Sequence, residues 1–330
     1  MWVAEEDNAL QGVILAAGKG SRLHPITTKR SKAMLPVLGR PIVERVIESI
    51  YVHGVNDFVM VVSEDDQEIR RYFEHECRLP VRFQFATQTE RRGMADALRC
   101  AAPFIRESFV LSACDNLVNA EHVGALLACF NYGSPANGAL TLMRIPESQL
   151  GKTGIVEIRE NGAQIEITRI IEKPRPEEAP TNIASLPLYV FSPRLLDLLP
   201  EIQLSKRGEY ELQDGIQMLI EQEGGVRGIF IQSRLQLTGP EDLLAINRHY
   251  LMSGLDRPQL APYSVGPGTQ LITPLRIEEG TVIGPNCVIG PRVYIERNCR
   301  IGTGVTIKDA VVLREATIPD NALVIGEVIS

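Results

Sequence analysis

Residues 11–251 alternate short apolar runs with amphipathic stretches, which is the pattern of an α/β domain. The runs GVILAA, DFVMVV and FVLSA, at 12–17, 57–62 and 109–113, are apolar at nearly every position. Strands buried on both faces of a parallel sheet have this composition. Further strands are predicted at 81–85 and 139–144, and helices at 42–52, 66–75, 94–101, 120–130, 211–223 and 241–251. We therefore expect a Rossmann-like, mostly parallel sheet with helices on both faces, and an antiparallel insertion in the turn-rich stretch 154–191.

The stretch 263–330 has a period of six residues. An aliphatic residue recurs at every sixth position, with a break at Pro319 and a return at Ile325. The predicted inward positions are these residues and the small or aliphatic residue four places later: Val265, Leu271, Ile277, Ile283, Ile289, Ile295, Ile301, Ile307 and Leu313, with Thr269, Leu275, Thr281, Cys287, Val293, Cys299, Val305, Val311, Thr317 and Leu323. A parallel β-helix explains this period, whereas an α-helix or a simple alternating strand does not. The repeat resembles the left-handed hexapeptide β-helix family, and the handedness rests on that resemblance.

Residues 252–262 (MSGLDRPQLAP) contain two prolines and a glycine and have few apolar anchors, so they are predicted to be a linker. The chain is thus expected to consist of a domain at 11–251, a linker at 252–262 and a β-helix at 263–330.

The charge and composition of the chain exclude some classes of protein. The formal net charge is −7, with acidic and basic residues interspersed, so we expect no nucleic-acid partner, which would require a basic face. No segment has the roughly 18 uninterrupted apolar residues of a membrane helix, so no membrane association is expected. The six cysteines form no Cys-x-x-Cys pair and are interpreted as reduced thiols of a cytoplasmic protein.

A glycine-rich loop follows the first apolar run. Two glycines after a buried strand let backbone N–H groups approach an anion closely, and the planar cation of Arg22 suits phosphate. The loop is not a Walker motif, because no Gly-Lys-Ser/Thr closes it, and Leu23 stands where a dinucleotide fingerprint has its third glycine. The residues expected to surround a nucleotide here are Leu15, Ala16, Ala17, Gly18 and Gly20.

Lys32 follows nine residues after Leu23 and begins the sequence KAMLPV. The whole stretch LAAGKGSRLHPITTKRSKAMLPVLGRPIVERVI resembles the signature of the sugar-1-phosphate nucleotidylyltransferases, also called nucleoside-diphosphate-sugar pyrophosphorylases. This resemblance implies that Arg22 and Lys32 grip a triphosphate and stabilise the charge on its α-phosphorus.

Two further motifs resemble the nucleotide side of this family. Gln88 and Gly93 match its Gln-x4-Gly segment, in which the amide and the glycine backbone contact the base. A side-chain amide can donate and accept at once, which suits a pyrimidine edge. Asp115 follows the strand 109–113 and matches the family's Mg²⁺-binding aspartate, although Cys114 replaces the usual glycine before it. Because ligands of such sheets bind beyond the carboxyl ends of the strands, we expect Asp115 and the glycine loop at one edge.

The sugar side is matched less closely. Gly154 resembles the family's glycine beside the hexose, and Glu172 and Lys173 resemble its Glu-Lys-Pro, which contacts the sugar hydroxyls and the sugar phosphate. Ser185 is expected beside the sugar, but Pro187 stands where the family has a glycine.

The family also supplies a second metal ligand, Asp or Asn, near residues 231–237. No carboxylate occurs in that stretch of this chain. Gln232 is the best match, with Gln236 as an alternative in another register, and a neutral amide is a weaker ligand for Mg²⁺ than a carboxylate.

The resemblance implies transfer of a nucleotidyl group from an NTP, UTP or dTTP, to a sugar 1-phosphate such as glucose 1-phosphate, with Mg²⁺ as cofactor. A non-catalytic or regulatory paralogue that binds nucleotide or sugar phosphate is the alternative. An acyltransferase role for the tail is disfavoured, because none of the five histidines lies in 263–330. The flat faces and edges of a β-helix suit a homo-oligomer.

Overall fold

The computed structural model describes residues 10–133, 136–162, 164–254 and 263–330, and these form two compact units. The first unit contains the chain up to Gly18 and Val46–Arg234, and the second contains Lys19–Arg45 and Leu235–Ser330. Most of the predicted linker, from 255 to 262, lies outside the described residues. Its residues Met252 and Ser253 belong to helix α7 (Pro240–Ser253).

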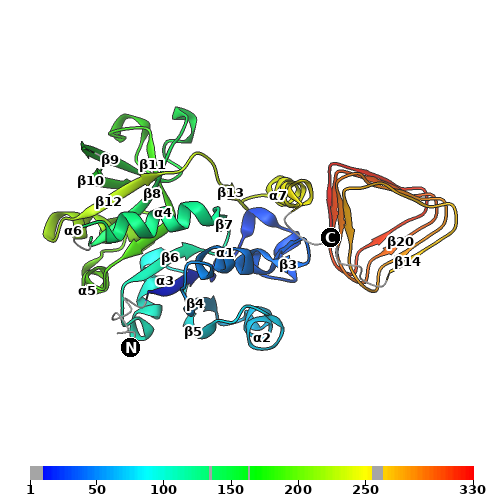
Figure 1. Cartoon of the computed structure of the whole chain (residues 1–330), viewed down its shortest axis with the longest axis horizontal. Helices are drawn as coiled ribbons and strands as arrows, with labels where there is room; N and C mark the ends of the chain where they lie inside the picture. The colour runs from blue at the N-terminus through cyan, green and yellow to red at the C-terminus, as the bar shows by residue number, and fades with distance from the viewer. Residues whose placement is uncertain (1–9, 134–135, 163, 255–262) are drawn as a thin grey trace, which may run out of the picture. The chain divides into compact units, whose positions relative to one another are not determined.

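The first unit is built on a nine-stranded sheet in the order β5-β4-β1-β6-β11-β8-β12-β10-β9 (Figure 1). The strands are β1 (Gln11–Leu15), β4 (Asp57–Ser63), β5 (Arg82–Gln88), β6 (Phe109–Ala113), β8 (Gly138–Arg144), β9 (Gly154–Asn161), β10 (Gln164–Glu172), β11 (Ile183–Phe191) and β12 (Val226–Phe230). Strands β5, β4, β1 and β6 are parallel, as their continuous apolar runs predict. Strands β9, β10 and β11 pair in antiparallel fashion, which confirms the insertion. Strand β12 was not predicted and pairs with β8 in parallel.

Helices pack against this sheet along their apolar sides. Helix α3 (Met94–Ala101) contacts β1, β4 and β5, while α4 (Ala120–Asn131) contacts β8, β11 and β12. Helix α6 (Leu212–Gln222) lies on β10. Helix α2 (Gln67–Arg71) is shorter than predicted and continues as a π-helical turn, Tyr72–Glu76, and the short α5 (Arg194–Leu198) was not predicted.

Close packing explains one glycine of the first strand. A Cβ atom on Gly12 would overlap the ring of Phe58 on the neighbouring strand, so only glycine fits there.

The second unit joins a segment from near the N-terminus to the C-terminal repeat. In that segment, residues 19–45, three short 3₁₀ turns (Ser21–Leu23, Ile26–Thr28 and Lys32–Met34) precede the hairpin of β2 (Pro36–Val37) and β3 (Arg40–Pro41). Helix α1 (Ile42–Tyr51) begins here. Helix α7 packs on β2 and on two strands of the repeat, β22 (Ala310–Val312) and β25 (Val328–Ile329).

The repeat is a left-handed parallel β-helix with three flat four-stranded sheets, seen as the three sides of a triangle in Figure 1. The first sheet contains β14 (Ser264–Val265), β17 (Val282–Ile283), β20 (Arg300–Ile301) and β23 (Thr317–Ile318). The second contains β15 (Gln270–Leu271), β18 (Val288–Ile289), β21 (Thr306–Lys308) and β24 (Leu323–Ile325). The third contains β16 (Leu275–Ile277), β19 (Val293–Ile295), β22 and β25.

The predicted inward positions from Ile277 to Ile307 are buried, and the inward positions shift by one residue afterwards. Ile289 pairs with Ile307, eighteen residues later, whereas Ile307 pairs with Val324, only seventeen residues later. Val324 is therefore buried, and Ile325, predicted to be inward, is 51% exposed. The same shift buries Ala310, Val312, Ala316 and Ile318 in the core and exposes Thr317 and Leu323. The first coil differs for another reason: Val265 and Leu271 are exposed because their strands, β14 and β15, have a neighbour on one side only within the described sheets.

Within the described ranges, no helix is long and apolar enough to cross a membrane.

Candidate active site

The loop after β1 and the residue after β6 lie at the same edge of the sheet, as predicted. Leu15 is aligned with Val61 on one side and with Ala113 on the other. The ladder continues one step further, because the Ala16 N–H donates to the Val61 carbonyl at 2.8 Å and the Cys114 N–H to the Leu15 carbonyl at 3.2 Å. Asp115 directly follows Cys114, whose N–H makes the last of these hydrogen bonds.

Asp115 is buried beside a cationic side chain that was not predicted to belong to the site. Asp115 and Asn116 are both buried, and Nη1 of Arg234 donates to Oδ1 of Asn116 at 3.0 Å. Burial lowers the pKa of the Arg234 guanidinium, and the Asp115 carboxylate opposes that shift. In the described part of the chain, the buried Nδ2 of Asn116 has no hydrogen-bond partner, so it can donate to a ligand oxygen.

The segment from Gln88 to Asp96 is held by hydrogen bonds within itself and by one hydrogen bond to the glycine loop. Gln88 ends β5 and is buried, and its Nε2 donates to Asp96 Oδ2 at 2.8 Å and to the Gly93 carbonyl at 3.3 Å. Arg91, between the two motif residues, donates from Nε to the Ala17 carbonyl at 2.7 Å. The structure thus brings Gln88, Gly93 and Ala17 together, and Arg91 is an additional residue that links them.

On the sugar side, three predicted residues lie on adjacent strands. Glu172 is paired with Gly154 across β10 and β9, and Ala184, next to Ser185, is paired with Ile155. Oγ1 of Thr153 donates to the Ser185 carbonyl at 3.2 Å. A Cβ atom on Gly154 would lie 3.1 Å from Glu172 Oε2, so glycine at this position leaves room in front of the carboxylate.

Glu172 is a buried carboxylate with cations on one side. Its Oε1 lies 3.2 Å from Lys173 Nζ and 3.6 Å from Arg207 Nη2, and its side chain is only 10% exposed. Burial raises the pKa of Glu172, and the Lys173 ammonium counteracts part of that shift. Within the residues described, its other oxygen, Oε2, is buried and accepts no hydrogen bond. A buried carboxylate oxygen without a donor is suited to accept a hydroxyl group from a ligand.

The local strand pairing explains why a proline is tolerated at position 187. The pairing of β11 with β8 shifts in register between Leu186 and Tyr189, and Pro187 lies in that irregularity. Proline has no N–H to give to a ladder, so it is tolerated at a bulge. The bulge accompanies a bond from Ser185 Oγ to the buried Tyr189 hydroxyl at 3.1 Å.

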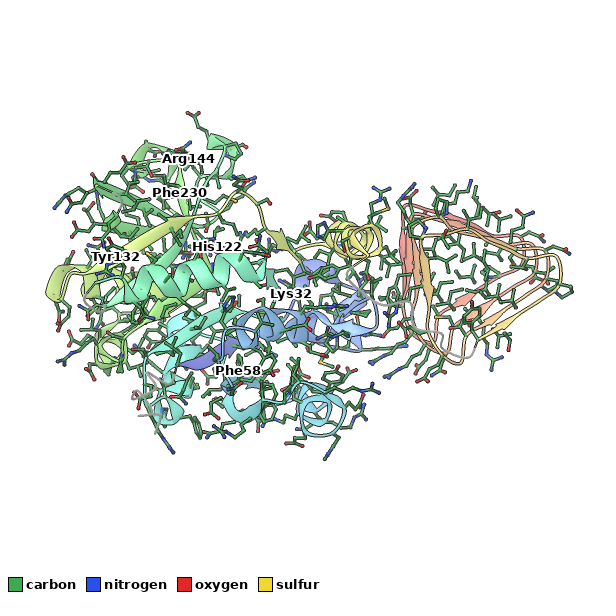
Figure 2. All side chains as sticks on the ribbon, viewed as in Figure 1. Lys32, Phe58, His122, Tyr132, Arg144 and Phe230 are labelled. Carbon is green, nitrogen blue, oxygen red and sulfur yellow. The ribbon has the colours of Figure 1, made fainter. Side chains whose placement is uncertain are left out.

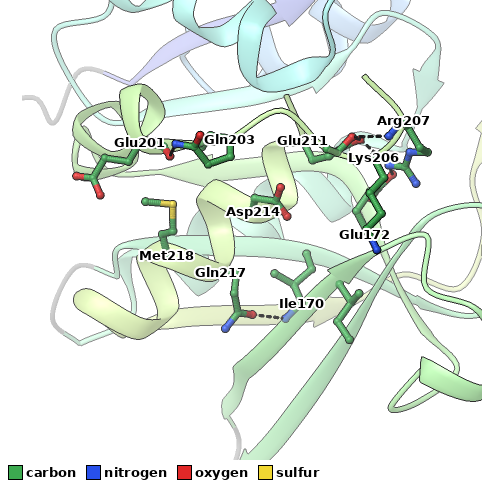
Figure 3. Close-up of a pocket in the computed structure, with 13 residues that line it drawn as sticks. Ile170, Glu172, Glu201, Gln203, Lys206, Arg207, Glu211, Asp214, Gln217 and Met218 are labelled. Carbon is green, nitrogen blue, oxygen red and sulfur yellow. Dashed lines mark hydrogen bonds and ion pairs between the residues drawn. The ribbon is translucent and has the colours of Figure 1, made fainter. Parts of the chain in front are cut away.

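A cavity of about 490 Å³ lies between β10, the segment 201–207 and α6 (Figure 3). Its lining includes carboxylates and cations: Glu172, Lys206, Arg207, Glu211 and Asp214. Nη2 of Arg207 donates to Glu211 Oε1 at 2.7 Å, which fixes the guanidinium at one side of the cavity. Because Glu172 is both a lining residue and a partner of Gly154, the cavity adjoins the predicted sugar side.

The predicted phosphate residues Gly20, Arg22 and Lys32 belong to the second unit. Gly20 has a φ of +61°, and a Cβ atom there would lie 3.0 Å from the Lys32 Cβ, so the two turns that carry Gly20 and Lys32 are in contact. Arg22 is exposed, and Lys32 is half-buried (Figure 2). The neighbouring Leu23 and Ala33 are buried and anchor the turns.

Comparison with known families gives a clear result. The family described as nucleotidyl transferase matches residues 11–233, and the one described as GMPPB C-terminal domain matches residues 271–330. The chain belongs to the nucleotidyl transferase family.

Similar proteins include other members of this family. The UTP–glucose-1-phosphate uridylyltransferase AglF of Haloferax volcanii is 33% identical over 234 residues, which are 71% of this chain and 93% of AglF. The bifunctional protein GlmU of Methanococcus maripaludis is 27% identical over 329 residues, 94% of this chain and 75% of GlmU. The structure of UTP-bound UGPase from Acinetobacter baumannii has a TM-score of 0.66 over 76% of this chain and 95% of its own, at 21% identity. That last likeness concerns the fold alone.

The groups around Asp115 bear on whether a metal ion can be held there. Within the described residues, no three His, Cys, Asp or Glu side chains gather where they could hold a metal ion. Gln232 is exposed, whereas Arg234, two residues later, reaches Asn116. Mg²⁺ is commonly held by one or two carboxylates together with substrate phosphates and water. One carboxylate, Asp115, fits that pattern when a triphosphate supplies further oxygens.

Proposed function

We propose that this nucleotidyl transferase joins an NTP to a sugar 1-phosphate, forming an NDP-sugar and pyrophosphate. The observation that carries the proposal is the edge where Leu15 aligns with Ala113, which brings the glycine loop and Asp115 together. The names of the relatives, UTP–glucose-1-phosphate uridylyltransferase among them, support this reaction.

The proposed chemistry is an in-line displacement at phosphorus. A sugar-phosphate oxygen attacks the α-phosphorus, a new P–O bond forms, and the bond to the pyrophosphate leaving group breaks. Arg22 and Lys32 contact the triphosphate, and Asp115, with Gln232 as a weak second ligand, holds Mg²⁺. The metal supplies neutralisation of phosphate charge, and the protein supplies positioning and fixed cations rather than a covalent nucleophile.

The polar groups described above suggest which nucleotide base and which sugar phosphate the site binds. Nε2 of Gln88 donates to Asp96 and to the Gly93 carbonyl, so its Oε1 remains to accept the ring N–H of uracil or thymine, and UTP or dTTP is the proposed donor. On the sugar side, Glu172 Oε2 accepts a hexose hydroxyl beside Gly154, and Lys173 contacts the sugar phosphate. Glucose 1-phosphate has both the hydroxyls and the phosphate that this arrangement requires.

Replacement of Lys32 tests the proposed role of the signature segment. Lys32→Ala removes a cation from the developing phosphate charge, so we expect turnover to fall about 10²- to 10³-fold. Lys29→Ala is the matched control, because Lys29 is an exposed lysine of the same segment. Pyrophosphate release is measured with saturating substrates, and thermal unfolding verifies the fold. Turnover of Lys32→Ala equal to that of the control would remove Lys32 from the mechanism.

A regulatory paralogue is the second candidate. It is favoured by Arg234, whose positive charge lies beside Asp115 where a metal ion is expected, and by the neutral Gln232. Such a protein would bind nucleotide or sugar phosphate and release no pyrophosphate.

We also propose that the chain forms a homo-oligomer through its β-helix. The last coil ends in strands β23, β24 and β25, each of which has a neighbour on one side only within the described sheets. Leu323 and Ile325 on that coil are 67% and 51% exposed. Unpaired edges with apolar side chains favour association with another chain.

A further inference from the structure

A buried ion pair joins the signature segment to the β-helix. Nη1 and Nη2 of Arg30 donate to Oε1 and Oε2 of Glu296 at 2.9 and 3.0 Å, although the two residues are 266 positions apart. Each residue is only 8% exposed. A planar guanidinium bound by both nitrogens fixes orientation as well as distance, so this contact restrains the backbone at residue 30.

The acceptor in this pair is itself held in place. Oε2 of Glu296 also accepts the backbone N–H of Arg314, in the next coil, at 2.7 Å. Glu296 directly follows β19, whose Val293 and Ile295 are part of the β-helix core. The carboxylate is therefore attached to the packed core of the repeat and cannot readily follow a displaced Arg30.

Two further polar contacts hold the same segment. The Gly39 N–H donates to the Tyr294 hydroxyl at 3.0 Å, and Tyr294 is completely buried although it lies between two core residues of a flat strand. Asn247 of α7 accepts the Leu38 N–H at 3.0 Å and donates to the Pro36 carbonyl at 3.1 Å. Hydrogen bonds and an ion pair thus hold residues 30–39 against α7 and against β19 with the residue that follows it.

Lys32 lies two residues after Arg30 and starts the turn Lys32–Met34. Ala33 and Met34 are buried, so the turn cannot rotate without disturbing its core contacts. The place of Arg30 therefore determines where the Lys32 side chain begins, and misplacement of a reacting group by about 1 Å can cost about 10²-fold in rate.

We propose that Glu296 is a positioning residue: through Arg30 it holds the Lys32 turn in the geometry that nucleotidyl transfer requires. The β-helix is then part of the catalytic apparatus as well as a surface for assembly. This inference rests on the proposed function for its kinetic consequence, whereas its structural part, the hold of Glu296 on the segment, is independent of it.

The test replaces the carboxylate by its neutral isostere in the full chain. Glu296→Gln keeps an oxygen for the Arg314 N–H but removes the charge that holds Arg30. Amide hydrogen exchange of residues 19–35 and steady-state kinetics are then compared with Asp320→Asn. That control neutralises a β-helix carboxylate that, like Glu296, accepts a backbone N–H of a neighbouring coil, that of Thr303 at 2.7 Å.

For Glu296→Gln we expect exchange in residues 19–35 to accelerate at least tenfold and turnover to fall about 10- to 100-fold. The KM for the sugar phosphate should stay within about twofold, because the displaced residues are assigned to the triphosphate. The control should change neither measurement. Exchange and turnover like those of the wild type in Glu296→Gln would overturn the proposal.

Two milder variants cover the case in which Glu296→Gln fails to fold. Arg30→Lys keeps the charge but loses the two-nitrogen contact, and Tyr294→Phe removes only the acceptor for Gly39. A loss of turnover that parallels faster exchange at residues 19–35 supports the proposal, and unchanged exchange in both variants refutes it. If the wild type transfers no nucleotide at all, the proposed function fails, and hydrogen exchange alone decides whether Glu296 holds the segment.

Discussion

Gly93 directly precedes α3 and has a φ of +105°, a value that side-chain-bearing residues rarely adopt. A Cβ atom there would lie 2.5 Å from the Tyr210 carbonyl oxygen and 3.0 Å from its nitrogen. Because these are backbone atoms, they cannot rotate away. We expect Gly93→Ala to lower the free energy of unfolding by about 3 kcal/mol, the sum of backbone strain and a steric clash.

Gly54 offers a matched comparison, because its φ is +88° and its Cβ direction is open. Gly54→Ala should cost only the strain of a left-handed backbone, about 1 to 2 kcal/mol. Chemical denaturation of both variants measures the difference. Equal losses would mean that the approach of Tyr210 does not explain the glycine.

At this scale, the site residues were predicted from their type and their order along the chain: glycines, a carboxylate after a strand and a Glu-Lys pair. Their roles stay predictions. Arg91 and Arg234 were not predicted, although Arg91 lies between Gln88 and Gly93 and Arg234 lies within residues 231–237. Their partners, Ala17 and Asn116, are 74 and 118 positions away, and an arginine in a loop gives no sign of which distant carbonyl or amide it will contact.

Among the elements, β21 and β22 show how a one-residue change in the repeat is accommodated. Asp309 lies between them at a φ of +47° and accepts hydrogen bonds from Arg292 and Arg248. The hydrogen bond from Arg292 lowers the pKa of Asp309 to about 2. The ionised carboxylate is therefore more stable in the folded state than in the unfolded chain, whose aspartates titrate near about 4.

This pKa predicts how acid affects the second unit. A lowered pKa gives stability that is present above about pH 4 and is lost as the pH falls toward about 2. Asp309→Asn should therefore lower the thermal midpoint at pH 7, and its deficit relative to the wild type should disappear near pH 2. Calorimetry at several pH values checks this. A deficit that does not depend on pH would show that charge at Asp309 is not the cause.

The elements were predicted more accurately than the residues, and the errors have physical reasons. Strands buried on both faces have a continuous apolar pattern, so β1, β4 and β6 were located within one or two residues. Strand β12 was missed because VRGIF is short and interrupted by a charge and a glycine. The shift in the β-helix after Ile307 was missed because the shortened coil still has aliphatic residues at most of the old and the new positions.

For the whole molecule, the proposed homo-oligomer depends on the exposed last coil. Leu323→Lys combined with Ile325→Glu should place charge on that surface and reduce the mass in solution to that of a single chain. Val52→Lys is the control, because Val52 is 56% exposed but belongs to the first unit. Sedimentation velocity at micromolar concentration gives the masses. A wild type that sediments as a single chain would contradict the oligomer.

The division of the chain into units could not be foreseen from the linear pattern. The sequence predicts that residues 19–45 continue the domain begun by β1, because they follow it directly. The structure groups them with the C-terminal repeat through Arg30 and Gly39, and with α7 through Leu38. Contacts over more than 200 positions leave no periodic trace, so only the folded chain reveals them.

The central claim, nucleotidyl transfer to a sugar 1-phosphate, is tested most directly by pyrophosphate release. UTP, dTTP, CTP, ATP and GTP are each paired with glucose 1-phosphate and other sugar 1-phosphates, with and without Mg²⁺. The account predicts Mg²⁺-dependent release that is fastest with UTP or dTTP and glucose 1-phosphate, with NDP-sugar formed in equal amount. Release no faster than the uncatalysed rate for every pair, from a folded protein that still binds nucleotide, would contradict it.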